Sequence, residues 1–142
     1  LSIYGEGELK EALVRYAEQL GISEAVKFHG FSSEIHKIMA GSAIYVSSSD
    51  YEGISNSMLE ALAIGIPAIC TDCPVGGARM YIRDGENGYL IPVGDADVMA
   101  DRMLALMEDK KLGESFSKES VKIREELTDD RIFGMWKSLL VR

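Results

Sequence analysis

The stretch AIYVSSSDYEGISNSMLEALAIGIPAIC, residues 43–70, decides the fold. It contains a short apolar run at 43–46, a polar loop, an apolar segment that ends at Gly65 and Pro67, and a second apolar run at 68–70. Two short strands separated by a segment of helix length are typical of a βαβ unit, which joins parallel strands. The stretch therefore predicts a parallel sheet covered by helices.

The same alternation continues on both sides of this unit. Strands are expected at 1–4, 26–28, 43–46, 68–70 and 89–91, with helices between them and a helical turn at 78–82. Asp95 or Asp97 can cap a further helix, and two more helices are expected at 112–126 and 129–141. This order predicts an α/β fold, a Rossmann-like parallel sheet with helices on both faces and an α-helical tail over about 95–142. We expect one domain over residues 1–142. It begins in mid-strand without Met, as a piece cut from a longer protein at its N-terminal edge would.

Composition excludes several classes of function. The 142 residues carry a net charge of −8, with 15 basic side chains scattered singly or in pairs. A nucleic-acid-binding surface and an anionic membrane face both require clustered basic residues. No apolar run approaches the roughly 20 residues that span a bilayer. We therefore expect a cytoplasmic protein without a nucleic-acid partner.

Cysteines and histidines point to no metal and no cofactor. Cys70 and Cys73 have the spacing of a dithiol redox motif, but Pro74 and two glycines follow where such a motif usually opens a helix. They are interpreted as a buried strand-end thiol and a loop thiol in a reducing compartment. His29 and His36 are too few to form a metal site without carboxylates.

Two carboxylates stand out in the quoted stretch. Between residues 58 and 64, Glu60 is the only residue that is not apolar, and Glu52 precedes it in the loop. A purely local explanation exists for Glu60, since Ser57 and Glu60 match a capping box. Glu52 alone fits a solvated loop acid. Ser55, Asn56 or Ser57 can each cap the helix, whose first N–H groups form an anion site without lysine.

In a parallel sheet, ligands bind in the loops at the carboxyl ends of the strands. Three informative loops are expected there, at 5–7, 47–57 and 71–79. The first contains Gly5 and Gly7, but Lys10 replaces the third glycine of a dinucleotide fingerprint, so it is a weak signal. All three loops are expected to face one crevice.

The segment SSSDYEGISNSMLEALAIGIPAICTD, residues 47–72, resembles the glutamate-x7-glutamate signature of retaining glycosyltransferases with the GT-B fold. This is the large family that uses nucleotide-activated sugars without a metal. LSIYGEGELKEAL, VKFHGF and VGGARMYIRDGENGYLIPVGD, residues 75–95, follow the family's order and spacing. The resemblance covers about the first hundred residues and implies the C-terminal half of a GT-B fold.

The resemblance also implies a role for each site residue. Glu52, the catalytic candidate, would lie beside the donor sugar and position it, while Glu60 would bind the ribose hydroxyls. A carboxylate of fixed orientation holds two vicinal hydroxyls well. The other residues implied to bind the donor are Ser49, Gly53, Ile54, Ser55, Asn56 and Ser57 around the sugar and diphosphate, and Gly30 and Phe31 near the base.

The chain departs from the family pattern at two positions. Ser55 stands where a glycine is frequent, and Met80 stands where a glutamate is frequent. Arg79 is open to two interpretations, a positive group in the site or a surface arginine. The basic pair that clamps the diphosphate would lie upstream of Leu1, together with a second Rossmann-like domain.

The function implied is that of a donor-binding domain. It would belong to a retaining glycosyltransferase of hexosyl or N-acetylhexosaminyl type, which moves a sugar from a nucleoside diphosphate sugar to a glycan or lipid-linked acceptor in polysaccharide biosynthesis. The fragment alone is expected to be inactive, and the missing N-terminal half could associate with a membrane. Two alternatives remain at this point, a nucleotide-sugar epimerase of GT-B architecture and a non-catalytic nucleotide-binding module.

Overall fold

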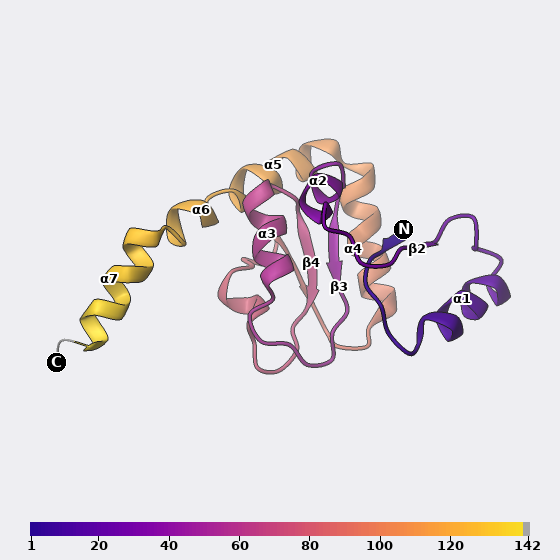
Figure 1. The fold of residues 1–142 in the computed structure, drawn as a ribbon. Helices are drawn as coiled ribbons and strands as arrows, with labels where there is room; N and C mark the ends of the chain where they lie inside the picture. Colours follow the sequence, from indigo (N-terminus) through magenta and orange to yellow (C-terminus); the bar gives the residue numbers. More distant parts are fainter. Residues whose placement is uncertain (141–142) are drawn as a thin grey trace. The chain divides into compact units, whose positions relative to one another are not determined.

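The computed structural model describes residues 1–140, which fall into two compact units (Figure 1). The first unit, Leu1–Ile35, contains β1 (Ser2–Ile3), α1 (Lys10–Gln19) and β2 (Lys27–Phe28). β1 and β2 pair in parallel, with Ser2 opposite Lys27 and Ile3 opposite Phe28. A single domain over residues 1–142 stays a prediction.

The second unit begins at His36 and holds most of the regular structure. Its elements in chain order are α2 (Ile35–Ala40), β3 (Tyr45–Ser47), α3 (Asn56–Ile64), β4 (Ala68–Thr71), η1 (Ala78–Met80), β5 (Gly88–Ile91), α4 (Ala96–Glu108), α5 (Lys110–Ser120), α6 (Ile123–Glu126) and α7 (Asp129–Leu140). α2 starts one residue before the boundary.

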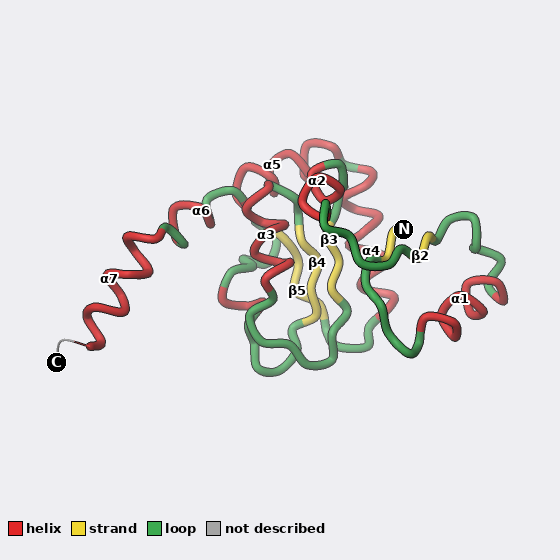
Figure 2. Tube along the Cα trace, in the orientation of Figure 1, coloured by secondary structure: helices red, strands yellow, loops and turns green. Residues whose placement is uncertain are grey.

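Three strands form the sheet of the second unit, with β4 between β3 and β5 (Figure 2). Both pairings are parallel, and Ile69 of β4 lies opposite Val46 of β3 and Tyr89 of β5. All four residues of β4 are buried, as expected for a central parallel strand. The predicted α/β class with parallel strands is confirmed.

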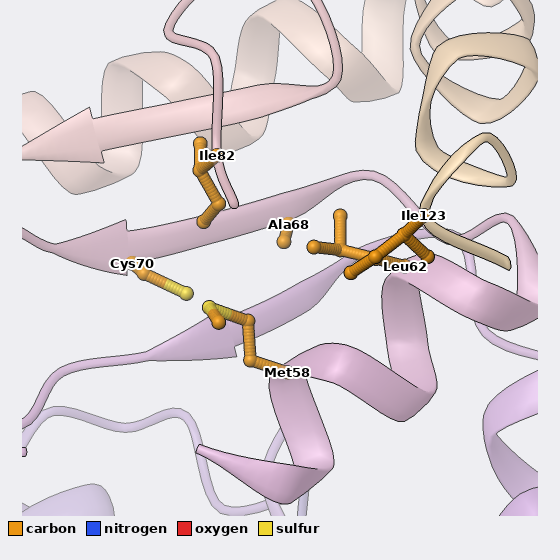
Figure 3. Packing of buried hydrophobic residues seen from close by; sticks show 6 residues of the cluster. All are labelled: Met58, Leu62, Ala68, Cys70, Ile82 and Ile123. Atoms are coloured by element: carbon orange, nitrogen blue, oxygen red, sulfur yellow. The ribbon is translucent and has the colours of Figure 1, made fainter. Parts of the chain in front are cut away.

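Helices cover both faces of this sheet. The side chains of β4 alternate between the two faces, so each face presents apolar side chains to the helices that pack on it. Ala68 and Cys70 pack with Met58 and Leu62 of α3, and Figure 3 shows the side chains of Cys70 and Met58 pointing toward one another. Ile69 packs on the opposite face, in a cluster that α4 and α5 complete with residues such as Leu106 and Phe116. Each large side chain buried in this way contributes about 1.5–3 kcal/mol. The βα loops are thus held between two packed layers.

The predicted helix at 112–126 is wrong in one respect, because α5 and α6 occupy this region as two helices. The break follows Ser120, whose hydroxyl donates to the carbonyl oxygens of Phe116 and Asn87. A serine that bonds back to the preceding turn bends a helix. The bond to Asn87 also fixes this point of the chain.

The C-terminal region is helical, as predicted. Asp95 caps α4 by accepting from the amide of Val98. α7 ends at Leu140, so the last residue of the predicted helix at 129–141 lies outside the described residues. None of the helices within residues 1–140 combines the length and the apolar character that crossing a membrane requires.

Candidate functional site

The loops that follow β3 and β4 are joined at Glu52. Its amide donates to the carbonyl oxygen of Pro74 at 2.8 Å, and its own carbonyl oxygen accepts from the amide of Val75 at 3.1 Å. The side chain of Glu52 remains exposed. The backbone of the catalytic candidate is therefore held on both sides while its carboxylate faces solvent.

A second contact joins the same two loops. A Cβ atom on Gly77 would overlap the backbone carbonyl group of Gly53 and approach the amide nitrogen of Ile54. Two backbones come this close only where one residue lacks a side chain. The sequence therefore needs glycine at position 77 to bring the loop after β4 against the start of α3.

Ser55 caps α3. It has extended backbone geometry, with φ −74° and ψ 119°, and its hydroxyl accepts from the amide of Met58 at 3.4 Å. Ser57 lies within the first turn, where its Oγ contacts the Tyr45 hydroxyl at 2.7 Å and Ser55 Oγ at 3.0 Å. The predicted capping box of Ser57 and Glu60 is wrong, because the cap lies two residues earlier, at Ser55.

Two amides at the start of α3 point to an anion site. Within residues 1–140, the amides of Asn56 and Ser57 have no backbone or side-chain acceptor. Such groups at a helix N-terminus carry a partial positive charge. No Lys or Arg occurs between Asp50 and Ala78. The positive potential of this stretch therefore comes from the backbone.

Glu60 contacts a different helix instead of the cap. Its Oε2 lies 3.2 Å from Nε2 of His36 on α2, and the two side chains are 41% and 65% exposed. The contact becomes an ion pair when the imidazole is protonated. The sequence by itself suggests no role for His36, and no local signal pairs it with Glu60.

A small cavity lies under the loop. Its volume is about 10 Å³, which is room for about one water molecule. Glu52, Gly53 and Ser55 line it from one side, and Cys70 and Thr71 of β4 line it from the other. The donor-binding candidates thus rest directly on the buried end of the central strand.

The two cysteines are buried and are not joined in a disulfide. Burial raises the pKa of the Cys70 thiol from 9.0 to about 12, and the neighbouring Cys73 adds to this increase. A hydrogen bond with the backbone of Ser47 lowers the pKa by a smaller amount. A thiol with so high a pKa is a poor nucleophile at neutral pH, because the thiolate is the reactive form. This geometry agrees with the packing interpretation of Cys70.

Arg79 lies in the loop after β4 and is paired with Asp72. Its Nε and Nη2 both lie 2.7 Å from Oδ1 of Asp72. The guanidinium is exposed, and the carboxylate balances its charge. Of the two interpretations left open by the sequence, this geometry fits the surface ion pair.

The remaining candidates fall in two places. Ser49 is half-buried, and its carbonyl oxygen accepts from the hydroxyl of Thr71, so it ties the loop to β4. Gly30 and Phe31 belong to the first unit, where the Gly30 carbonyl accepts from the amide of Gly5 and Phe31 is 85% exposed. The second unit thus brings together the candidates from Ser49 to Glu60, and the two base-binding candidates belong to the first unit.

The described residues hold no group of three His, Cys, Asp or Glu side chains suited to a metal ion.

Two residues that shape this site are not among the candidates expected from the sequence. Tyr45 supports Ser57 from β3, and Gly77 admits the neighbouring loop. The paired glycines at 76–77 were the only available signal for the second contact. Nothing in the sequence marks Tyr45, because an aromatic residue in a strand is ordinary.

Residues 1–122 match the family model described as glycosyl transferases group 1. EpsD of Bacillus subtilis (strain 168) is 36% identical over 140 residues, which cover 96% of this chain and 36% of that protein. The poly(ribitol-phosphate) alpha-N-acetylglucosaminyltransferase of Staphylococcus aureus (strain COL) is 32% identical and matches 96% of this chain and 28% of that protein. The chain thus spans about a third of the length of these relatives.

Solved structures agree with the sequence matches. The crystal structure of TarM superposes with a TM-score of 0.89 at 30% identity, covering 97% of this chain and 28% of that one. The pneumococcal O-GlcNAc transferase GtfA, crystallised with UDP and GlcNAc, superposes with a TM-score of 0.83 at 27% identity, covering 97% of this chain and 28% of that one.

Proposed function

Because the chain belongs to the glycosyl transferases group 1 family, we propose that it is the donor-binding part of a retaining glycosyltransferase. The transferred group is a hexosyl or N-acetylhexosaminyl unit, and the donor is a nucleoside diphosphate sugar. The observation that carries the proposal is the start of α3, where uncapped amides lie between the carboxylates of Glu52 and Glu60 in the chain. These groups match three of the four chemical parts of such a donor, the ribose, the diphosphate and the sugar.

The ribose, the diphosphate and the sugar of the donor each have a partner in this arrangement. The carboxylate of Glu60 binds the two ribose hydroxyls, which are good donors to a charged acceptor. The amides of Asn56 and Ser57 bind the diphosphate, as helix N-termini bind phosphate elsewhere. Glu52 positions the sugar near its anomeric carbon. Support comes from relatives crystallised with UDP, among them GtfA.

The same amides serve the reaction as well as binding. Negative charge grows on the diphosphate as the bond to the sugar breaks, and oriented N–H groups stabilise such charge without reorganisation. The backbone hydrogen bonds of Glu52 with Pro74 and Val75 hold the point from which its side chain extends toward the sugar. Glu52 acts as a donor-positioning residue and not as a nucleophile.

The rest of the reaction belongs to the other part of a longer parent protein. We assign the acceptor site, for a glycan or a lipid-linked sugar, and the basic pair that clamps the diphosphate to that part. The 142-residue chain alone should then bind nucleotide weakly and transfer no sugar. No metal is required in this scheme, since backbone amides and the basic pair carry the diphosphate charge.

The test is a titration of the 142-residue chain with UDP, GDP and ADP, in which ligand-detected NMR measures the binding of each nucleotide. One of the three is expected to bind, and Glu60→Gln should weaken it by roughly tenfold, the effect of a charged hydrogen bond of about 1.5 kcal/mol. Glu114→Gln is the matched control, because Glu114 pairs with Lys110 on the exposed side of α5.

Three results would each contradict a part of the proposal. Equal affinity of wild type and Glu60→Gln would remove the ribose assignment. Absence of binding of all three nucleotides by a folded chain would remove the donor-binding function itself. Turnover by the isolated chain would show that it needs no second domain.

A further inference from the structure

We propose that His36 is a positioning residue for Glu60, holding one carboxylate oxygen so that the other is presented to the ribose hydroxyls. The inference rests on the proposed function, which makes Glu60 the ribose-binding residue. Its physical basis is the distance of 3.2 Å between Nε2 of His36 and Oε2 of Glu60.

The contact is the main polar constraint on the Glu60 side chain. Glu60 is the single charged residue of α3, whose other members are apolar or neutral. A glutamate on a helix surface samples several rotamers, and fixing it on binding costs affinity. A partner on the neighbouring helix reduces this cost before the nucleotide arrives.

The second oxygen remains available for the ligand. His36 engages Oε2, and within residues 1–140 no hydrogen bond or ion pair involves Oε1 of Glu60. A carboxylate offers about four lone-pair directions, so one imidazole does not exhaust it. The arrangement can therefore bind His36 and ribose together.

The support depends on the proton of the imidazole, because only a protonated histidine carries the charge that attracts the carboxylate. The charged groups around it are Glu60 on α3 and, next to it in the sequence, Glu34 and Lys37. On β3, the titratable Tyr45 has its hydroxyl engaged with Ser57. The attraction to Glu60 is present when the imidazole is protonated and weakens as the pH rises.

The experiment compares wild type, His36→Gln and His36→Lys at about pH 5.5 and pH 8. The probes are UDP-, GDP- and ADP-glucose, whose esterified phosphates do not change charge over this range. Wild type should bind its preferred probe about two- to fivefold more tightly at the lower pH, the range expected for an exposed ion pair. His36→Gln should bind weakly at both values. His36→Lys, which keeps a positive charge throughout, should bind tightly at both.

A double-mutant cycle with Glu60→Gln separates positioning from a general effect on α2. In the Glu60→Gln background, the further change His36→Gln should leave affinity unaltered, because the partner carboxylate is gone. Circular dichroism verifies that each variant is folded.

The outcomes distinguish this inference from the proposed function. If Glu60→Gln weakens binding while His36→Gln retains wild-type affinity and pH profile, the positioning role is wrong and the donor-binding function stands. If wild type binds none of the three probes at either pH, the donor-binding function is wrong and the positioning role falls with it. If His36→Lys behaves like His36→Gln, charge is not the means by which His36 acts.

Discussion

The backbone carbonyl group of Gly53 occupies the space that a Cβ atom on Gly77 would need. The two glycines stand in the loops after β3 and β4, so this contact fixes the spacing of the two loops at which the donor is proposed to bind. The hydrogen bonds between Glu52 and residues Pro74 and Val75 lie beside it.

Gly77→Ala should therefore destabilise the chain by about 1–3 kcal/mol, because the loops must separate to admit a methyl group. Urea unfolding followed by circular dichroism measures the change. Gly53→Ala is the control from the other side of the contact, since a Cβ there meets nothing within 4 Å. Equal losses in the two variants would show that the contact is not as close as described.

Ser55→Ala should cost about 1 kcal/mol of stability by removing the cap of α3. The substitution leaves the amide of Met58 without its acceptor and takes away one contact of Ser57. Ser48→Ala, an exposed change in the same loop, is expected to be neutral. An unchanged unfolding midpoint in Ser55→Ala would mean that the cap contributes little to the helix.

Cys70 should make the chain less stable in alkali. Its pKa is about 12 when folded, against an ordinary value of 9.0, so above pH 9 the unfolded thiol loses its proton first. The unfolded state then binds fewer protons than the folded state, and the free energy of unfolding falls by up to about 1.4 kcal/mol per pH unit.

The stabilisation from Cys70 is therefore complete below pH 9 and is lost as the pH rises toward 12. Unfolding of wild type and Cys70→Ala with a reductant present, at several values from about pH 8 to 11, measures the slope. Cys70→Ala should show a shallower decline, because the other titrating groups are common to both. Parallel curves would contradict the effect of burial on this thiol.

Asn87→Ala should cost about 1–3 kcal/mol, because Asn87 is buried and satisfies two backbone groups. Its Oδ1 accepts from the amide of Arg83 at 2.8 Å, and its Nδ2 donates to the carbonyl oxygen of Tyr81 at 2.9 Å. Glu86→Ala is the control next to it, since its ion pair with Arg83 is exposed and worth little. Comparable thermal unfolding of both variants would refute this role of Asn87.

Much of the fold could be predicted from local patterns. The apolar residues at 68–70 predict a strand, which the structure has at Ala68–Thr71, and Gly65, which has a φ of 96°, predicts the end of α3. The boundary at Ser120 could not be predicted. The Ser120 hydroxyl there also contacts the carbonyl oxygen of Asn87, a residue that is distant in sequence.

The cap of α3 shows why the site was harder to predict than the fold. Three consecutive polar residues could each cap the helix, and the local motif favoured Ser57 with Glu60. In the structure Tyr45 contacts the Ser57 hydroxyl and His36 contacts the Glu60 carboxylate. Both partners come from elements that the local sequence of α3 does not include.

The sequence by itself determined the α/β class, the parallel strands and the family, because apolar periodicity and the order of motifs are properties of the chain. Only the tertiary structure decided how Gly53 meets Gly77 and which residue holds Glu60. The reason is physical. Such contacts join segments that the sheet brings together, and their geometry depends on the packing of whole layers around β4.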